Sequence, residues 1–293
     1  MDSLRTDESM PSSPNHENKS PNDNNKNVTR NIQGIDVMHV LIEMKRNEHK
    51  NFVYCPTRSY VKYYEDIFAE LTALEDDLHV SKQTKQMALS YFCRFLESSL
   101  VDRFLYPSYA FICFIIAMKM EEPKDLLPCT LDLAANYPQF LSSPEDLYDL
   151  ERDVLDGLSW KLRCITPMHY LSIFFMDPIV SRLVPSTILK SQIHDKRCVD
   201  YLRLFAFFFS DVALGHYKYR QYGPSLLAVA CFVCAKHALQ IKPYWDDSYQ
   251  DVMQTTSEDA WTVHDELWQD YSRLYPECST QIEAMTPTNP WDV

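Results

Sequence analysis

Glycine is scarce in this chain of 293 residues, which contains only four, where average usage of about 7% would give roughly 20. Glycine serves hairpins, bulges and phosphate-cradling loops because it adopts positive φ without steric cost. Four scattered glycines exclude a dinucleotide fingerprint and a P-loop, which need several at close spacing. The scarcity favours a mostly helical protein, and a hydrophobic share of 46% can fill sizeable cores.

An excess of positive charge is also missing, since 28 basic residues face 41 acidic residues and the formal net charge is −13. A net negative charge is unfavourable for binding nucleic-acid phosphates, so we expect no direct nucleic-acid partner. The longest clean apolar run, residues 109–118, has ten residues, short of the ~18–20 of a membrane helix, and we expect no membrane partner. With no secretory signal at the amino terminus, the nine cysteines indicate reduced thiols in a nuclear or cytoplasmic protein.

Catalytic and metal-binding patterns are likewise weak. Cys231-x-x-Cys234 followed by His237 winds around a helix and has no second ligand pair of matching spacing, so we expect buried thiols rather than a metal site. The acid–base triplet at residues 264–266 lies between two tryptophans on what the pattern predicts as a solvated helix face. We expect a protein that is not an enzyme and that uses no cofactor or metal.

The composition of both ends of the chain predicts tails. Residues 1–34 hold seven asparagines and no aromatic residue, a composition that cannot offset the entropy of ordering, so we expect disorder there. Ser13 and Ser20 each precede a proline and are candidates for proline-directed phosphorylation; the alternative is a tail that is merely rich in serine and proline. Residues 276–293 are polar and interrupted by prolines, which indicates a second, shorter tail.

Between the tails, apolar residues recur at helical spacing. Apolar pairs every four residues predict a helix from Lys82 to about Ser99. A second helix begins near Pro107 and is apolar on every side, which predicts a place in the middle of a bundle. Ser143 followed by proline and two acids predicts a helix start, and that helix is expected to continue to about Trp160. Thr166-Pro167 predicts another start.

An internal repeat organises these helices. The segment YPSYAFICFIIAMK, ending at Lys119, aligns at a constant offset of 117 residues with YGPSLLAVACFVCAK, ending at Lys236. Each copy follows an aromatic-rich amphipathic segment. The repeat predicts two related helical bundles in tandem, the first within residues 35–165 together with a leading helix and the second within residues 166–275.

Several motifs in this order resemble those of the cyclin family. They are YFCRFLES (residues 91–98), AMKMEE (117–122), DLERDVLDGLSWKL (149–162) and YGPSLLAVACFVCA (222–235). The resemblance covers residues 66 to 275, approximately, and implies an all-α fold of two five-helix cyclin boxes. It also implies a non-catalytic subunit that binds and activates a cyclin-dependent protein kinase in cell-cycle or related nuclear control.

The resemblance further implies which residues contact the kinase. In the family a lysine at the end of the third box helix and a glutamate on the fifth bind backbone groups beside a mobile kinase helix, and these positions are Lys119 and Glu151 here. An ammonium supplies only donors and a carboxylate only acceptors, so the two can hold backbone C=O and N–H groups through charge-assisted bonds. Met120, Leu126 and Leu155 would supply apolar area around them. The alternative is that Lys119 merely extends to solvent from the bundle and Glu151 is a solvated edge charge.

Two departures from the family pattern bear on substrates. The apolar docking motif of cell-cycle cyclins falls on Tyr63, Tyr64, Ile67 and Glu70, and the aspartate that pairs with its arginine is Cys93 here. Both charges of that pair are missing, so we expect no docking patch of the usual kind. The tails hold no RxxL degradation signal, and the match at residues 152–155 lies inside a predicted helix.

These departures leave a second hypothesis open, a divergent cyclin-like scaffold that recruits factors to a chromosomal process such as meiotic crossover formation. A third, a general transcription factor of the B type, shares the tandem bundle. It is disfavoured because such proteins resemble DNA clamps with a zinc ribbon, whereas this chain is acidic and has no paired CxxC near its start.

Overall fold

The computed structural model describes residues 36–141, 143–176, 179–184 and 195–278. Within these ranges the chain forms helices and their connections without a strand, so the predicted all-α fold is confirmed. Residues 1–34, with Ser13 and Ser20, lie outside the described residues, as does most of the predicted carboxyl-terminal tail.

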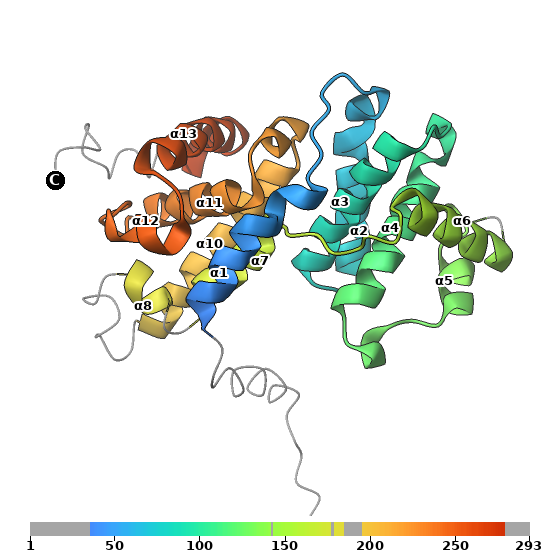
Figure 1. The fold of residues 1–293 in the computed structure, drawn as a ribbon, viewed down its shortest axis with the longest axis horizontal. Helices are drawn as coiled ribbons and strands as arrows, with labels where there is room; N and C mark the ends of the chain where they lie inside the picture. Colours follow the sequence, from blue (N-terminus) through green and yellow to red (C-terminus); the bar gives the residue numbers. More distant parts are fainter. Residues whose placement is uncertain (1–35, 142, 177–178, 185–194, 279–293) are drawn as a thin grey trace, which may run out of the picture. The chain divides into compact units, whose positions relative to one another are not determined.

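The first half is a bundle around α4 (Tyr106–Glu121), which contacts α2, α3 and α6 (Figure 1). Every residue from Tyr109 to Met118 is buried, as expected of an apolar helix at the centre of a bundle. The stretch Arg103–Glu121 is long and apolar enough to cross a membrane by length and composition, but 61% of it is buried by the rest of the protein. The other elements are η4 (Ser59–Tyr63), α2 (Tyr64–Leu78), α3 (Lys82–Ser98), η5 (Arg103–Leu105), η6 (Lys124–Leu126), α5 (Thr130–Asn136) and α6 (Pro144–Gly157).

The second half repeats this plan around α11 (Pro224–Ala238), which contacts α7, α10 and α13. The repeat that was read from the sequence therefore places α4 and α11 at equivalent positions, each as the buried helix of its own bundle. The surrounding elements are α7 (Pro167–Phe174), α8 (Val180–Leu183), α10 (Asp195–Leu214), η7 (Tyr217–Gln221), α12 (Ser248–Met253) and α13 (Ser257–Leu274).

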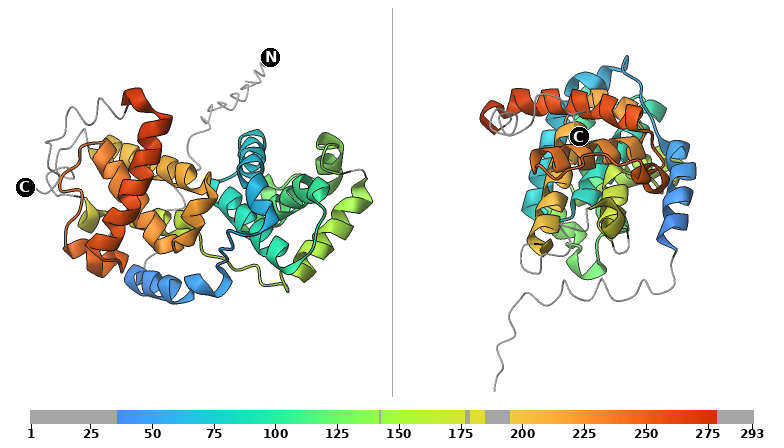
Figure 2. Two further views of the ribbon diagram at one scale, coloured as in Figure 1. Left: turned by 90° about the horizontal axis from the view of Figure 1, so that it is seen from above. Right: turned by 90° about the vertical axis from the view of Figure 1, so that its left-hand side faces the viewer.

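The leading helix α1 (Val37–Asn47) packs against α7 and α12 of the second half, although it comes first in the sequence (Figure 2). It is followed by η3 (Glu48–Asn51), whose Glu48 side chain is fully buried. Glu48 accepts hydrogen bonds from the Tyr170 hydroxyl at 2.9 Å and from the Ser225 amide at 3.0 Å. Because Ser225 is at the start of α11, the carboxylate satisfies an amide that the helix leaves free.

A charge cluster joins the two halves. Lys82 and Lys85 of α3 pair with Glu75 of α2 and with Asp211 of α10. Lys85 is almost fully buried, and its ammonium lies 3.1 Å from the Asp211 carboxylate. A buried lysine needs such partners, because an unpaired charge there costs several kcal/mol. The cluster therefore fixes α10 against the first half.

Two details differ from the sequence predictions. Helix α6 ends at Gly157 rather than near Trp160, because Ser159 and Trp160 both have positive φ, 52° and 58°, which ends a right-handed helix. His264 is not on a solvated face: it is 3% exposed and stacks on Trp268. Asp265 beside it is exposed, so the acid–base triplet is split between core and surface.

Candidate functional site

Lys119, near the end of α4, meets Glu151, in the middle of the neighbouring helix α6. The Lys119 ammonium donates to a carboxylate oxygen of Glu151 at 2.6 Å, although 32 positions separate the two in sequence. The Lys119 side chain is 42% exposed and that of Glu151 is 17% exposed. The structure thus brings the two charges predicted from the family resemblance side by side, within reach of solvent. The role of the pair in binding a partner stays a prediction.

The AMKMEE motif explains why Lys119 points outward. Its last residue, Glu122, accepts hydrogen bonds from the Ser81 amide at 2.8 Å and from the Thr84 hydroxyl at 2.6 Å. Burial would raise the pKa of Glu122, but these hydrogen bonds lower it below its usual value. The carboxylate ties the end of α4 to the start of α3, and this fixes the direction in which the preceding turn presents Lys119.

Helix α6 is held in place at both ends. Ser143 and Asp146 form a reciprocal capping box at its start. At its end, a Cβ on Gly157 would lie 2.6 Å from the Phe95 ring, so only glycine permits this close approach to α3. Arg94 of α3 then donates to the Lys161 carbonyl at 2.7 Å. Tyr91 likewise donates to the carbonyl of residue 162 at 2.6 Å. The tyrosine and arginine of YFCRFLES therefore anchor to α3 the segment that follows α6.

Exposed or half-buried apolar side chains are near the ion pair in sequence. Met120 and Leu126 are 51% and 63% exposed, and Leu155 is half-buried on α6. Sequence reasoning missed two exposed aromatic residues, Tyr148 and Trp160. Tyr148, Glu151 and Leu155 share one face of α6 because they are three and four residues apart, and this spacing was the available signal. Exposed apolar side chains together with charged groups are typical of a protein-binding site.

The pair is chemically suited to binding a polypeptide backbone. Lys119 retains donors beyond the one that Glu151 uses, and Glu151 retains free lone pairs. The pair therefore offers a partner one donor and one acceptor at adjacent points, and the resulting charge-assisted hydrogen bonds are stronger than those between neutral groups. For the residues that the structure describes, no cluster of His, Cys, Asp or Glu could hold a metal ion. Cys231 and Cys234 are buried, and burial raises the pKa of both thiols.

The positions of the family docking motif are largely internal. Tyr64 and Ile67 are buried, and Tyr63 packs edge-on against the Tyr106 ring, so these residues leave little apolar surface for a partner. The missing charge pair is partly replaced in a way that the sequence did not predict. Arg220 of η7 is buried near Tyr64 and Cys93, and its Nε atom donates to no atom within the described ranges.

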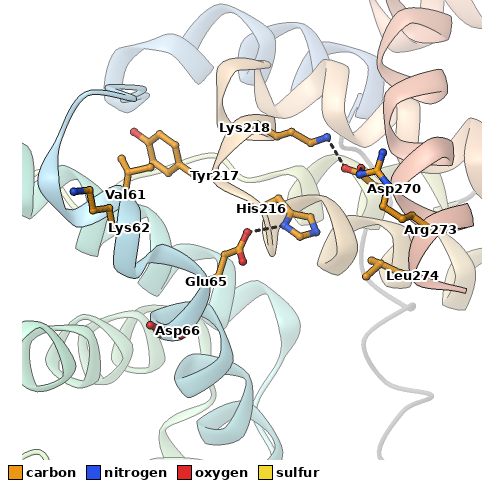
Figure 3. A pocket seen from close by; sticks show the side chains of 10 residues that line it. All are labelled: Val61, Lys62, Glu65, Asp66, His216, Tyr217, Lys218, Asp270, Arg273 and Leu274. Atoms are coloured by element: carbon orange, nitrogen blue, oxygen red, sulfur yellow. Dashed lines mark hydrogen bonds and ion pairs between the residues drawn. The ribbon is translucent and has the colours of Figure 1, made fainter.

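A hollow of about 470 Å³ opens where the two halves meet (Figure 3). On one side Glu65 accepts from His216 at 2.8 Å; on the other Asp270 binds Lys218 at 2.6 Å. Burial would raise the pKa of Asp270, but the bonds from Lys218 and from the Tyr219 hydroxyl lower it. Positive and negative groups compensate each other around this hollow, which indicates a junction rather than a site for a charged ligand.

Comparison with known families decides the identity of the fold. The family model for the cyclin N-terminal domain matches residues 36–163, and that for the cyclin C-terminal domain matches residues 165–283. The chain belongs to the cyclin family. Cyclins are regulatory subunits rather than catalysts, and Lys119 and Glu151 both lie within the N-terminal domain of this cyclin.

Individual relatives are distant. The cyclin is 26% identical to a cyclin-J-like protein of Mus musculus over 242 residues, which cover 77% of this chain and 59% of the mouse protein. It is 24% identical to cyclin-D of Ostreococcus tauri over 259 residues, 86% of this chain and 66% of that protein. The chain thus spans less than two thirds of the length of both relatives.

Two solved structures show the same fold. One is a viral cyclin from herpesvirus saimiri, with a TM-score of 0.60 and 13% identity over 81% of this chain and 99% of the viral chain. The other is a chain of the yeast RNA polymerase II CTD kinase complex CTDK-1, with a TM-score of 0.53 and 15% identity over 84% of this chain and 82% of that chain.

Proposed function

We propose that this cyclin binds and activates a cyclin-dependent protein kinase as its regulatory subunit, in cell-cycle or related nuclear control. The contact surface consists of Lys119 and Glu151 with the apolar residues Met120, Leu126 and Leu155, and the exposed Trp160 extends it. The cyclin itself contributes no catalysis, and its place of action is the nucleus, the cytoplasm or both.

One observation carries this proposal, the 2.6 Å contact between Lys119 and Glu151 at a partly exposed point of the first box. A purely structural ion pair at a partly exposed position contributes only about 0–1 kcal/mol, so stability alone gives little reason for it. The chain in the CTDK-1 kinase complex, which shares the fold, supports a kinase as the class of partner.

Substrate selection is proposed to differ from that of cell-cycle cyclins, because the docking positions Tyr64 and Ile67 are buried and the usual arginine and aspartate are absent at positions 64 and 93. The same observation favours a second candidate function, a scaffold that recruits factors to a chromosomal process such as meiotic crossover formation. In that case kinase activation is secondary or lost.

The test is a charge swap, Lys119→Glu combined with Glu151→Lys. The swap preserves an ion pair within the cyclin but exchanges the positions of donor and acceptor toward the partner. Purified kinase catalytic subunits are first screened for binding to the unmodified cyclin, and the swap is then assayed with the kinase that binds. We expect affinity to fall at least thirtyfold, because losing partnered charged groups at an interface costs about 2–5 kcal/mol.

A control ion pair is available in the second half. Asp200 and Arg203 form an exposed ion pair on α10, and exchanging these two residues should leave kinase affinity and thermal stability unchanged. If the swap at Lys119 and Glu151 still binds and activates normally, the proposed contact is wrong. If no kinase binds the unmodified cyclin, the scaffold function is favoured instead.

A further inference from the structure

Helix α10 has a second apolar face in addition to the one that it buries. Leu202, Ala206 and Phe209 are buried in the second half. On the other side Tyr201 and Leu204 are 56% and 59% exposed, and they continue into Phe205 and Phe208, which are half-buried. These four residues follow the i, i+3, i+4, i+7 spacing of one helix face.

The end of α13 extends this face. The Tyr275 ring, which is exposed, lies 5.5 Å from the Phe208 ring between centroids. Tyr201, Leu204, Phe205, Phe208 and Tyr275 thus form one contiguous surface, which we call the α10 patch. A contiguous apolar surface of this kind indicates that something covers it, whereas single exposed apolar residues need no explanation. The patch belongs to the second half, whereas Lys119 and Glu151 belong to the first.

The chain itself supplies a segment that fits the patch. Residues 279–293, with the sequence STQIEAMTPTNPWDV, start four positions after Tyr275 and carry the apolar residues Ile282, Met285, Trp291 and Val293. Fifteen extended residues reach up to about 50 Å, whereas the patch runs along only about 10 Å of α10 from Phe208 to Tyr201. The segment is therefore long enough to lie across the whole patch.

We propose that residues 279–293 cover the α10 patch within the same molecule, with Trp291 as the main apolar anchor. The covalent link favours this segment over a second copy, because a short tether gives an effective concentration in the millimolar range. A large aromatic side chain is the strongest single anchor that the segment offers, because it buries the most apolar area. The proposal is independent of the kinase contact.

The test is methyl NMR on the full chain with labelled leucine side chains, compared with a chain that ends at Cys278. All described residues are retained in the shortened chain, so its fold is expected to persist. We expect nuclear Overhauser contacts between the Trp291 indole and the Leu204 methyls in the full chain, and a change in the Leu204 methyl shifts when residues 279–293 are removed. Leu100, which is fully exposed in the first half, is the control leucine and should not change.

Substitutions within the segment sharpen the result. Trp291→Ala should reproduce the Leu204 shifts of the shortened chain, whereas Thr288→Ala should leave them as in the full chain. The proposal is overturned if removing residues 279–293 leaves the Leu204 methyls unchanged. It is also overturned if their contacts come from the segment 185–194, or if they depend on protein concentration, as a second copy would require.

Discussion

Replacing Lys236 by methionine is expected to stabilise this cyclin at pH 7, although the change deletes a hydrogen bond. Lys236 is the repeat equivalent of Lys119, but it is fully buried in the second half. Its ammonium donates to the Tyr249 hydroxyl at 2.7 Å and lies over the Tyr249 ring, 4.6 Å from its centroid. Burial lowers the pKa of Lys236 to about 7, and the charge of Asp246 opposes this only in part.

The magnitude follows from the difference in pKa between the folded and unfolded chain. A solvated lysine has a pKa of about 10.4, and one unit of pKa corresponds to about 1.4 kcal/mol. Between pH 7 and about 10.4 the unfolded chain binds a proton that the folded chain lacks, so the wild type gains stability as the pH rises. At pH 7 the lowered pKa of Lys236 therefore reduces the free energy of unfolding by about 4 kcal/mol. Losing the bond to Tyr249 offsets about 1 kcal/mol, and we expect a net gain of roughly 2–3 kcal/mol.

Urea denaturation followed by tryptophan fluorescence measures this gain. The midpoint for Lys236→Met should exceed that of the wild type at pH 7, and the difference should shrink toward pH 10. Lys119→Met is the matched control, because Lys119 is 42% exposed and its substitution should change stability by no more than about 1 kcal/mol. A variant less stable than the wild type at pH 7, or a difference that does not vary with pH, would refute the reasoning.

Three further experiments test other parts of the account. Glu48→Gln replaces the buried carboxylate through which η3 binds Tyr170 and the start of α11, and it should lower the free energy of unfolding by about 1–3 kcal/mol; a loss below about 0.5 kcal/mol would contradict this role. Cys93→Asp places a carboxylate near Arg220, so a double-mutant cycle with Arg220→Met should show favourable coupling, and zero coupling would mean that the two groups do not interact. Burial lowers the pKa of His237 to about 4, so the folded state loses stability as the pH falls from about 6.5 to 4. His237→Phe should lose less over that window in acid titrations of stability, and parallel curves would contradict the assignment.

The helical architecture could be predicted from local pattern because its signals are local. Apolar periodicity, the Ser143 cap and the proline starts each depend on a few consecutive residues, and the 117-residue repeat related α4 to α11. The end of α6 was misplaced because the left-handed turn at Ser159 and Trp160 has no glycine to mark it.

Side-chain contacts over long sequence distances were harder to foresee. Spacing could not predict the proximity of Lys119 and Glu151, which came from the family resemblance. No sequence pattern indicated that Glu48 and Ser225, which are 177 positions apart, form a hydrogen bond. His264 was assigned to a solvated helix face together with the rest of the 264–266 triplet, and only the packing of Trp268 against it reveals that it is buried.

The most direct test of the central claim is site-specific photo-crosslinking from the α4–α6 surface. A photoreactive amino acid replaces Met120 in the full chain, and the cyclin is illuminated together with the kinase subunit that it binds. The account predicts covalent capture of the kinase from position 120 and none from position 204 on α10. A complex that forms normally but crosslinks from position 204 and not from position 120 would contradict it.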